Sequence, residues 1–145
     1  MKKSLILALL CTIIVSCAST KQFKKLTDNE PLPADKARIY LVRTGNFGGF
    51  VKFNAFLNEL DNQVGVVGPK SFICFDVPQG EQKIIVKAET ERFFTINAQA
   101  GKTYYLRLVP KMGVNYARVN FEMLSNEEGS AEVKRLKSPK MLYAE

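Results

Sequence analysis

The chain has 145 residues, of which 21 are basic and 14 are acidic, so its formal net charge is +7. It contains no histidine and three cysteines, which removes the commonest general base and the usual zinc ligands. A chain of this length is expected to form one compact domain around one hydrophobic core.

The first segment, residues 1–16, is predicted to be a cleaved signal peptide. Lys2 and Lys3 give it a positive start, about eleven apolar residues follow, and Ser16 is small, as in secretory signals. A membrane-spanning helix needs about 20 apolar residues. We therefore expect no permanent span here.

The end of this segment, Ile14-Val15-Ser16-Cys17, resembles the lipobox of bacterial lipoproteins. The resemblance implies cleavage before Cys17, a diacylglycerol on its thiol, and a further acyl chain such as palmitate on its new amino group. Two or three chains on one residue hold a protein at a membrane durably, whereas one chain holds it weakly. By the same resemblance, Ala18 in place of an aspartate predicts the outer membrane. The alternative is a conventional signal cut near Ala18 to Thr20.

The cysteines fit an exported protein without intrachain disulfides. Cys11 leaves with the signal and Cys17 is expected to carry lipid, so Cys74 remains. It lies in the apolar run "SFICFDV", and no histidine is present to activate it. We therefore expect Cys74 to be a small, half-buried strand residue rather than a nucleophile.

Residues 17–36 are expected to form a lipidated cysteine and a flexible tether, since they are polar, contain two prolines and show no sustained period. Lys21, Lys24 and Lys25 would lie beside the lipid, where each charge adds up to about 1 kcal/mol of attraction to anionic head groups. Without the two lysines of the signal, 19 of the 21 basic side chains remain against 14 acidic ones. Such an excess permits nucleic-acid binding. An exported, anchored protein rarely meets nucleic acid, so we expect none.

Residues 37–145 are predicted to be one all-β domain. Short runs of β-branched and aromatic residues alternate with glycine, proline and asparagine about every 8 to 12 residues. This pattern predicts a single antiparallel β-sandwich, immunoglobulin-like, with about eight strands. The strands are expected at residues 37–44, 51–58, 63–67, 71–77, 82–89, 93–99, 103–110 and 114–124.

Alternation along these strands predicts which side chains enter the core between two sheets. For the first strand, the sequence leaves the buried face open. The expected core sets are Val51, Phe53, Ala55 and Leu57; Ile73, Phe75 and Val77; Ile84, Val86 and Ala88; Phe94, Ile96 and Ala98; Tyr104, Leu106 and Leu108; and Ala117, Val119, Phe121 and Met123.

Glycines mark the turns. Pro78 and Gly80 predict a tight reversal, and Gly101 predicts another before a strand. The loop "TGNFGGF" has neither the spacing of a P-loop nor that of a dinucleotide fingerprint. We expect it to be a flexible loop without a phosphate site.

A short C-terminal helix is expected near residues 127–137. Ser125 with Glu128 fits a capping box, and Ser130 is a later alternative for the N-cap. Gly129 weakens the prediction, because glycine is a poor helix former.

Four blocks of the domain resemble a known family. In chain order they are "ARIYLVRTGNFGG", "VPQGEQKIIVKAE", "AGKTYYLRL" and "EEGSAEV". Their order after a lipobox resembles the bacterial lipoproteins of the domain-of-unknown-function 2846 family, over about residues 37–133. The resemblance implies a fold and an envelope location, and it assigns no reaction.

A speculative binding surface lies opposite the predicted core sets. If the strands adjoin, aromatic rings and guanidinium groups would form a stripe able to hold a planar sugar or an acidic group. The alternative, favoured because such placement is common in strands, is ordinary cross-strand pairs worth about 0.2–1 kcal/mol each. The residues are Tyr105 with Arg107, Tyr116 with Arg118, and Arg38 near Tyr40.

The sequence therefore predicts a lipid-anchored, non-catalytic envelope lipoprotein that binds a protein partner or an envelope polymer. We expect no cofactor, no metal site and no catalytic residue, since Asp61, Asp76, Glu89 and Glu91 are scattered rather than gathered in a calcium loop. The alternative is a small envelope hydrolase or transferase with an unrecognised active site.

Overall fold

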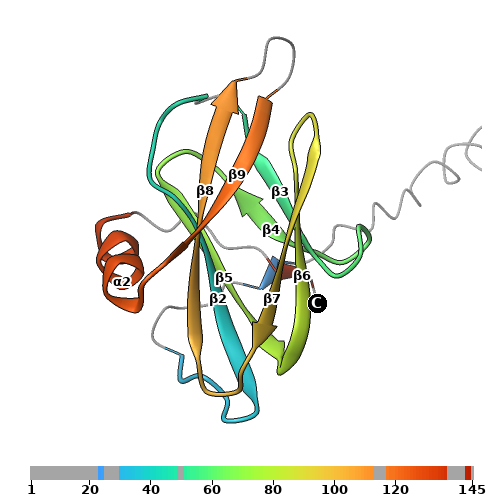
Figure 1. Ribbon diagram of the computed structural model, residues 1–145, viewed down its shortest axis with the longest axis vertical. Coiled ribbons are helices and arrows are strands. Elements are labelled where there is room, and N and C mark those ends of the chain that lie inside the picture. Colours follow the sequence, from blue (N-terminus) through green and yellow to red (C-terminus); the bar gives the residue numbers. More distant parts are fainter. Residues whose placement is uncertain (1–22, 25–29, 49–50, 113–116, 137–142, 145) are drawn as a thin grey trace, which may run out of the picture.

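The computed structural model describes residues 23–24, 30–48, 51–112, 117–136 and 143–144. Two four-stranded sheets dominate it (Figure 1). Sheet I has the order β5 (Ser71–Pro78), β2 (Lys36–Arg43), β8 (Thr103–Met112) and β9 (Ala117–Leu124). Sheet II has the order β4 (Gln63–Val67), β3 (Phe53–Leu57), β6 (Gly80–Lys87) and β7 (Glu91–Ala98). The predicted β-rich, two-sheet fold with a short C-terminal helix is thus confirmed.

The expectation of a wholly antiparallel sandwich is wrong at one pair of strands. β2 runs parallel to β8, with Tyr40 opposite Tyr105, whereas the other pairs within sheets I and II are antiparallel. The turn before β8 explains this, because the N–H of Gly101 donates to the carbonyl of Lys36 at 2.8 Å. The turn is thereby fixed at the start of β2, so both strands begin at the same end of the sheet.

The predicted turn at Gly101 is present, whereas the tight reversal predicted at Pro78 and Gly80 is wrong, because one bend residue there carries the chain from β5 in sheet I to β6 in sheet II. Gly80 has a φ of 113° and Gly101 a φ of 75°, a backbone region that residues with a Cβ rarely adopt. Gly80 begins β6 directly after the strand that Pro78 ends. Gly80 thus allows the chain to pass from sheet I into β6 of sheet II. Gly101 allows it to return from β7 to β8, which lies beside β2 in sheet I.

The core lies between the sheets, where the predicted alternation is largely realised. Phe53, Ala55, Ile84, Val86, Ile96 and Ala98 from sheet II, and Ile73, Phe75, Val77, Leu106, Leu108 and Val119 from sheet I, are buried. At one side of the sandwich, the ring centroids of Phe94 and Phe121 lie 5.8 Å apart. This ring contact joins β7 of sheet II to β9 of sheet I.

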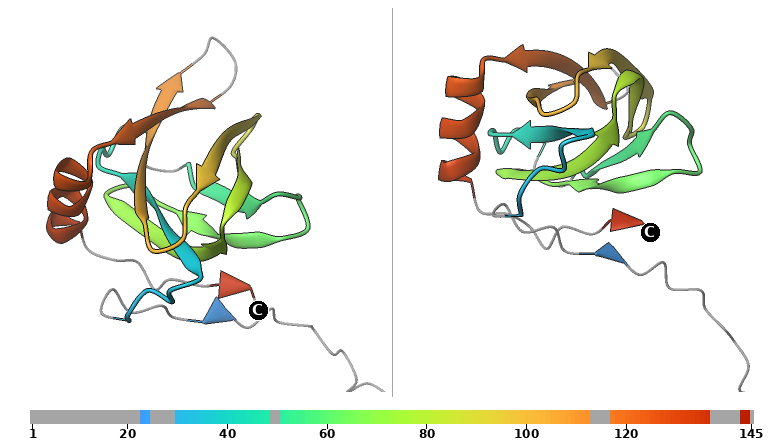
Figure 2. Two further views of the ribbon diagram at one scale, coloured as in Figure 1. Left: turned by 60° about the horizontal axis from the view of Figure 1, so that its bottom comes forward. Right: turned by 90° about the horizontal axis from the view of Figure 1, so that it is seen from below.

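Both faces of β2 are buried, which answers the question that its sequence left open. Ile39 and Leu41 face the core, and Arg38, Tyr40 and Val42 on the opposite face are also buried. Helix α2 (Asn126–Arg135) contacts β2, β8 and β9, and it stands beside this outer face of sheet I (Figures 1 and 2). Sheet I is therefore sandwiched between sheet II and a helix.

Helix α2 begins with the predicted capping box. Ser125 accepts a hydrogen bond from the N–H of Glu128, whose carboxylate accepts one from the N–H of Ser125. Gly129, expected to weaken the helix, has a packing role. A Cβ at this position would lie 2.1 Å from Cγ of Tyr105, so glycine lets α2 lie close against β8.

A third, two-stranded sheet joins distant parts of the chain. β1 (Phe23–Lys24) pairs antiparallel with β10 (Tyr143–Ala144), and the two lie side by side in Figure 2. β1 falls within the segment expected to be a tether. Residues 1–16, Cys17 and Ala18 lie outside the described residues. Among the described helices, none has the length and apolar character needed to cross a membrane.

Candidate functional site

The structure gathers four of the six stripe residues on one face of sheet I. Arg38 and Tyr40 come from β2, and Tyr105 and Arg107 come from the adjacent β8. The rings of Tyr40 and Tyr105 are stacked, with centroids 4.9 Å apart and an interplanar angle of 17°. The strands that carry these two pairs therefore adjoin, which is the condition for a stripe.

Of the other two residues, the structure describes only Arg118. Arg118 is exposed near the start of β9, opposite Lys111. Tyr116 lies outside the described residues.

Arg38 is committed to an ion pair in the fold. Its Nε and Nη2 donate to the two oxygens of Asp76 at 2.7 and 3.0 Å, and its Nη1 donates to the carbonyl of Glu30 at 2.8 Å. The hydrogen bonds to Asp76 raise the pKa of Arg38 above its ordinary value, although burial acts in the opposite direction. A bidentate pair of this kind fixes the guanidinium plane, so Arg38 holds β2 to β5.

The tyrosines form a packed layer rather than an open platform. Tyr40 is 7 % exposed and contacts Phe72, with ring centroids 5.9 Å apart. Tyr105 is partly buried and lies directly under Gly129 of α2. Neither ring therefore offers a free face of the size that a stacked sugar needs.

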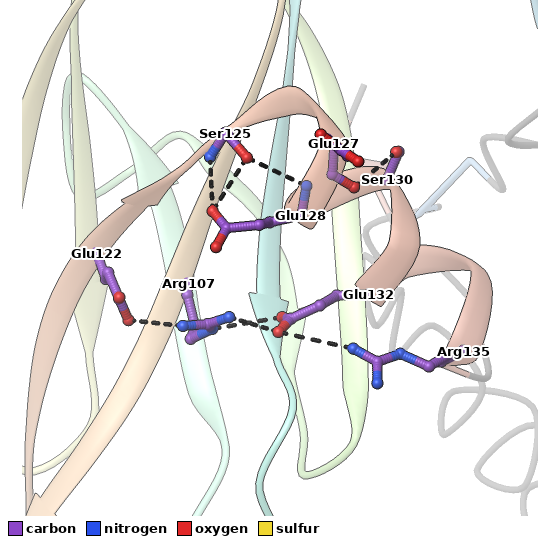
Figure 3. A network of polar contacts seen from close by, with 8 residues as sticks. All are labelled: Arg107, Glu122, Ser125, Glu127, Glu128, Ser130, Glu132 and Arg135. Atoms are coloured by element: carbon purple, nitrogen blue, oxygen red, sulfur yellow. Dashed lines mark hydrogen bonds and ion pairs between the residues drawn. The ribbon is translucent and has the colours of Figure 1, made fainter.

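Arg107 lies at the centre of a charged network at the edge of this layer (Figure 3). Its Nη1 donates to Oε2 of Glu122 at 2.8 Å, and its Nε and Nη2 donate to the carboxylate of Glu132. Nη2 of Arg135 lies 4.0 Å from Oε1 of this Glu132 carboxylate. The hydrogen bonds that Arg107 donates to Glu132 raise its pKa, burial lowers it, and the hydrogen bond that it donates to Glu122 raises it further.

A cleft opens beside Arg107. It has a volume of about 430 Å³, within the range of small-ligand sites. A neighbouring hollow of about 200 Å³, lined by Thr44, Glu132, Arg135 and Leu136, meets the cleft at Thr44 and Glu132. The cleft is lined by Thr44, Gly45, Phe47, Arg107, Leu108, Val109, Pro110, Glu122 and Glu132.

The glycine-rich loop that forms one wall of the cleft is held from below by Arg43. This side chain is fully buried, and its Nη2 donates to the carbonyls of Phe47 and Gly48 at 2.9 Å each. Its guanidinium carbon lies 4.6 Å from the ring centroid of Phe53. Burial lowers the pKa of Arg43. The described part of the expected flexible loop is thus anchored to a buried cation, and Phe47 at its tip remains 57 % exposed.

A second hollow lies on the opposite side of the molecule, over sheet II. It has a volume of about 260 Å³ and is lined by residues that include Leu60, Ile85 and Phe93. Lys83 lies 4.7 Å from the centroid of the exposed Phe93 ring. This ring is already contacted by a cation of the same chain, so we regard the Arg107 cleft as the better candidate site.

The cysteine and the scattered carboxylates do not meet in the cleft. Cys74 is buried on β5 and forms no disulfide. Asp76 pairs with Arg38, and Glu91 lies 3.2 Å from Lys87. Within the described ranges, no group of three or more cysteine or acidic side chains could hold a metal ion.

The family model that matches the chain is that of a protein of unknown function, DUF2846, and it covers residues 33–120. The chain belongs to this family. The DUF2846 match begins before β2 and ends within β9. It therefore includes the Thr44, Phe47 and Arg107 walls of the cleft, whereas Glu122 and Glu132 lie beyond it.

One curated relative of this DUF2846 protein is an uncharacterized protein of Haemophilus influenzae. The two are 28% identical over 99 residues, which are 68% of this chain and 58% of the relative. The chain thus spans less than two thirds of that relative's length. No solved structure matches the chain.

Sequence reasoning about this DUF2846 protein found Arg107 but missed its surroundings. Glu122 lies directly opposite Arg107 on the neighbouring strand β9, and Glu132 is 25 residues away on a helix. One signal was present for the loop, because Arg43 ends an apolar strand immediately before the glycines. A buried cation at that point needs carbonyl acceptors, and the following loop supplies them.

Proposed function

We propose that this protein is a lipid-anchored, non-catalytic lipoprotein of the cell envelope that displays its β-sandwich to bind a protein partner or an envelope polymer. Signal cleavage before Cys17 and acylation of that residue would supply the anchor, with palmitate among the acyl chains. Ala18 after the cysteine supports delivery to the outer membrane. This part of the proposal rests on the charged start, the short apolar stretch and the lipobox-like end of the signal.

The cleft beside Arg107 carries the binding part of the proposal. It joins an exposed aromatic ring, Phe47, to a guanidinium and carboxylate network within one surface hollow of about 430 Å³. Apolar contact area with a few converging polar groups is the usual composition of a binding site. The sandwich and Arg43 hold these groups in place before any ligand arrives, which lowers the entropic cost of binding.

The geometry supports binding better than an enzymatic role in the envelope. A general acid or base needs a titratable group free to exchange a proton with substrate. In the cleft, Glu122 and Glu132 both accept hydrogen bonds from Arg107, so these carboxylates are engaged as acceptors. A hydrolase or transferase would have to use Glu122, the more exposed of the two carboxylates, while that residue is paired with Arg107.

We also propose that the sandwich is immunoglobulin-like. In that fold, strands B and E pair in one sheet, while strands C′, C, F and G pair in order in the other. The pairs β2 with β5, and β4-β3-β6-β7, follow this order if β2 is taken as strand B. β8 and β9 would then be additions after strand G, with β8 at the side of strand B where strand A would lie.

The anchor is tested by metabolic labelling with an alkyne analogue of palmitate, followed by membrane fractionation on a density gradient. The wild-type protein is expected to incorporate label and to sediment with the outer membrane. Cys17→Ser is expected to lose the label and to remain unprocessed. Normal processing and membrane retention of Cys17→Ser would refute the lipid anchor.

The binding role is tested separately by crosslinking in intact cells from a photoreactive residue placed at Thr44. We expect a discrete crosslinked species that contains a protein or a polymer fragment, whereas the same residue placed at Lys83, over sheet II, should give none of that species. A full-length, folded protein that yields no cleft-specific product would contradict the binding role. Turnover of glycan or peptide substrates that depends on Glu122 would instead support an enzyme.

A further inference from the structure

We infer that the Arg107 cleft binds a neutral glycan, with a sugar ring stacked on Phe47 and neighbouring hydroxyl groups held by Arg107 and Glu122. This inference rests on the proposed function, because it names the chemical class of the polymer that the displayed domain would bind. It narrows the sequence-based hypothesis for this surface, which names a planar sugar or an acidic group as the ligand and favours ordinary cross-strand pairs over binding.

The first step is the aromatic platform. Phe47 is 57 % exposed, yet its backbone is fixed because its carbonyl accepts a hydrogen bond from the buried Arg43 at 2.9 Å. Val109 and Pro110 continue the apolar lining of the same cleft. An exposed ring on a held backbone, with apolar neighbours, suits the C–H face of a sugar ring, which is itself apolar.

The second step is the charge balance, which disfavours an acidic ligand. Arg107 already faces two carboxylates, those of Glu122 and Glu132. Arg135 lies 4.0 Å from Glu132, so two guanidinium groups face two carboxylates and this network carries no net charge. A phosphate or carboxylate group entering the cleft would leave the network with an uncompensated negative charge, whereas a neutral ligand would not.

The third step is the hydrogen-bonding capacity that remains. Glu122 is 54 % exposed in its side chain and uses Oε2 for Arg107, so its second oxygen faces solvent as an acceptor. A guanidinium has five N–H donors, of which the contacts to Glu122 and Glu132 use three. Thr44 adds a hydroxyl to the lining. Adjacent donors and acceptors match vicinal hydroxyl groups, each of which donates and accepts.

The experiment uses the full-length protein, purified in mild detergent, and isothermal titration with two soluble probes of similar size. One is the neutral tetrasaccharide tetra-N-acetylchitotetraose, and the other is the polyanionic tetragalacturonate. We expect the neutral sugar to bind at least tenfold more tightly than the anionic one. Tighter binding of tetragalacturonate, or no binding of either sugar by the folded protein, would overturn the inference.

Variants locate the site. Phe47→Ala is expected to weaken chitotetraose binding about tenfold, because it removes the stacking ring, and Glu122→Gln about fivefold, because it replaces a carboxylate oxygen by an amide nitrogen. Neither change creates a buried vacancy, since both side chains are exposed. Phe93→Ala is the matched control, because this phenylalanine is also exposed but lies over sheet II. Loss of binding in Phe93→Ala with full binding in Phe47→Ala would place the sugar elsewhere and refute the inference.

The two proposals fail in different ways. A protein that is acylated at Cys17 and crosslinks to a protein partner from Thr44, but binds no sugar, keeps the proposed function and loses the glycan. A protein that binds chitotetraose through Phe47 but carries no lipid keeps the glycan and loses the anchor.

Discussion

Replacing Gly129 with alanine tests whether α2 is held against sheet I by close approach. In an exposed helix, alanine is about 1 kcal/mol more favourable than glycine, so helix propensity predicts stabilisation. In this protein, a Cβ at residue 129 would lie 2.1 Å from Cγ and 2.4 Å from Cβ of Tyr105. Carbon atoms normally stay about 3.5–4.0 Å apart. The helix would therefore have to move by roughly 1.5 Å.

The displacement has two costs. Forcing extra volume into a packed contact costs about 1–3 kcal/mol, and moving α2 stretches the hydrogen bonds between Glu132 and Arg107. The gain in helix propensity offsets about 1 kcal/mol. We expect a net decrease of about 1–2 kcal/mol in the free energy of unfolding, which for a domain of about 110 residues lowers the melting temperature by about 4 °C per kcal/mol.

Urea unfolding followed by circular dichroism measures the difference between the wild type and Gly129→Ala. Ala131→Gly is the matched control, because this residue is exposed on the same helix and should lose about 1 kcal/mol by propensity alone. In a Tyr105→Ala background the clash is removed, so Gly129→Ala should become stabilising. If Gly129→Ala stabilises the wild-type protein by about 1 kcal/mol, the close packing of α2 on Tyr105 is wrong.

Three further predictions concern the arginines. Arg38→Met is expected to lower the free energy of unfolding by about 3–5 kcal/mol, because it leaves Asp76 without its cation. In a double-mutant cycle measured by urea unfolding, adding Asp76→Asn should recover part of this loss. Purely additive effects of the two changes would contradict the pairing. Arg43→Met is expected to speed proteolysis of the glycine-rich loop at least fivefold, since two loop carbonyls lose their hydrogen-bond donor. A proteolysis time course resolved by mass spectrometry measures this rate. An unchanged cleavage rate would show that Arg43 does not hold the loop. The pKa of Arg107 is raised in the folded state, so its contribution to stability is present below the ordinary arginine value and is lost only when pH rises through the raised one. The stability difference between the wild type and Arg107→Gln should thus stay constant from about pH 7 to 10, and a decline within that window would contradict the assignment.

The strands could be predicted because their information is local. Alternation in runs such as residues 51–58 and 82–89 reflects one face toward the core and one toward solvent, so it survives in the sequence. The same holds for Ser125 and Glu128, whose capping box needs three residues of spacing. Each of these predictions depends on neighbours within one element.

The parallel pairing of β2 and β8 could not be predicted in the same way. It joins Tyr40 to Tyr105, 65 residues apart by their numbers, and no local pattern records which strand will lie beside another. The burial of both faces of β2 has the same origin, because α2 covers the outer face only after the chain has passed through the whole sandwich. Arg38 is basic, so its sequence alone favours an exposed position. Its burial depends on the ion pair with Asp76, which lies on the separate strand β5.

Contacts between residues that are distant in the sequence also determine which ligand charge the cleft favours. The segment that matches the family, residues 33–120, supplies the aromatic ring of Phe47 and the guanidinium of Arg107. The residues that follow it supply both carboxylates, Glu122 and Glu132. Without these two, the same cleft would present a cation beside an aromatic ring and would favour anions. The preference for a neutral ligand therefore depends on β9 and α2, which supply the carboxylates. The rest of the cleft, without them, would favour an anionic ligand.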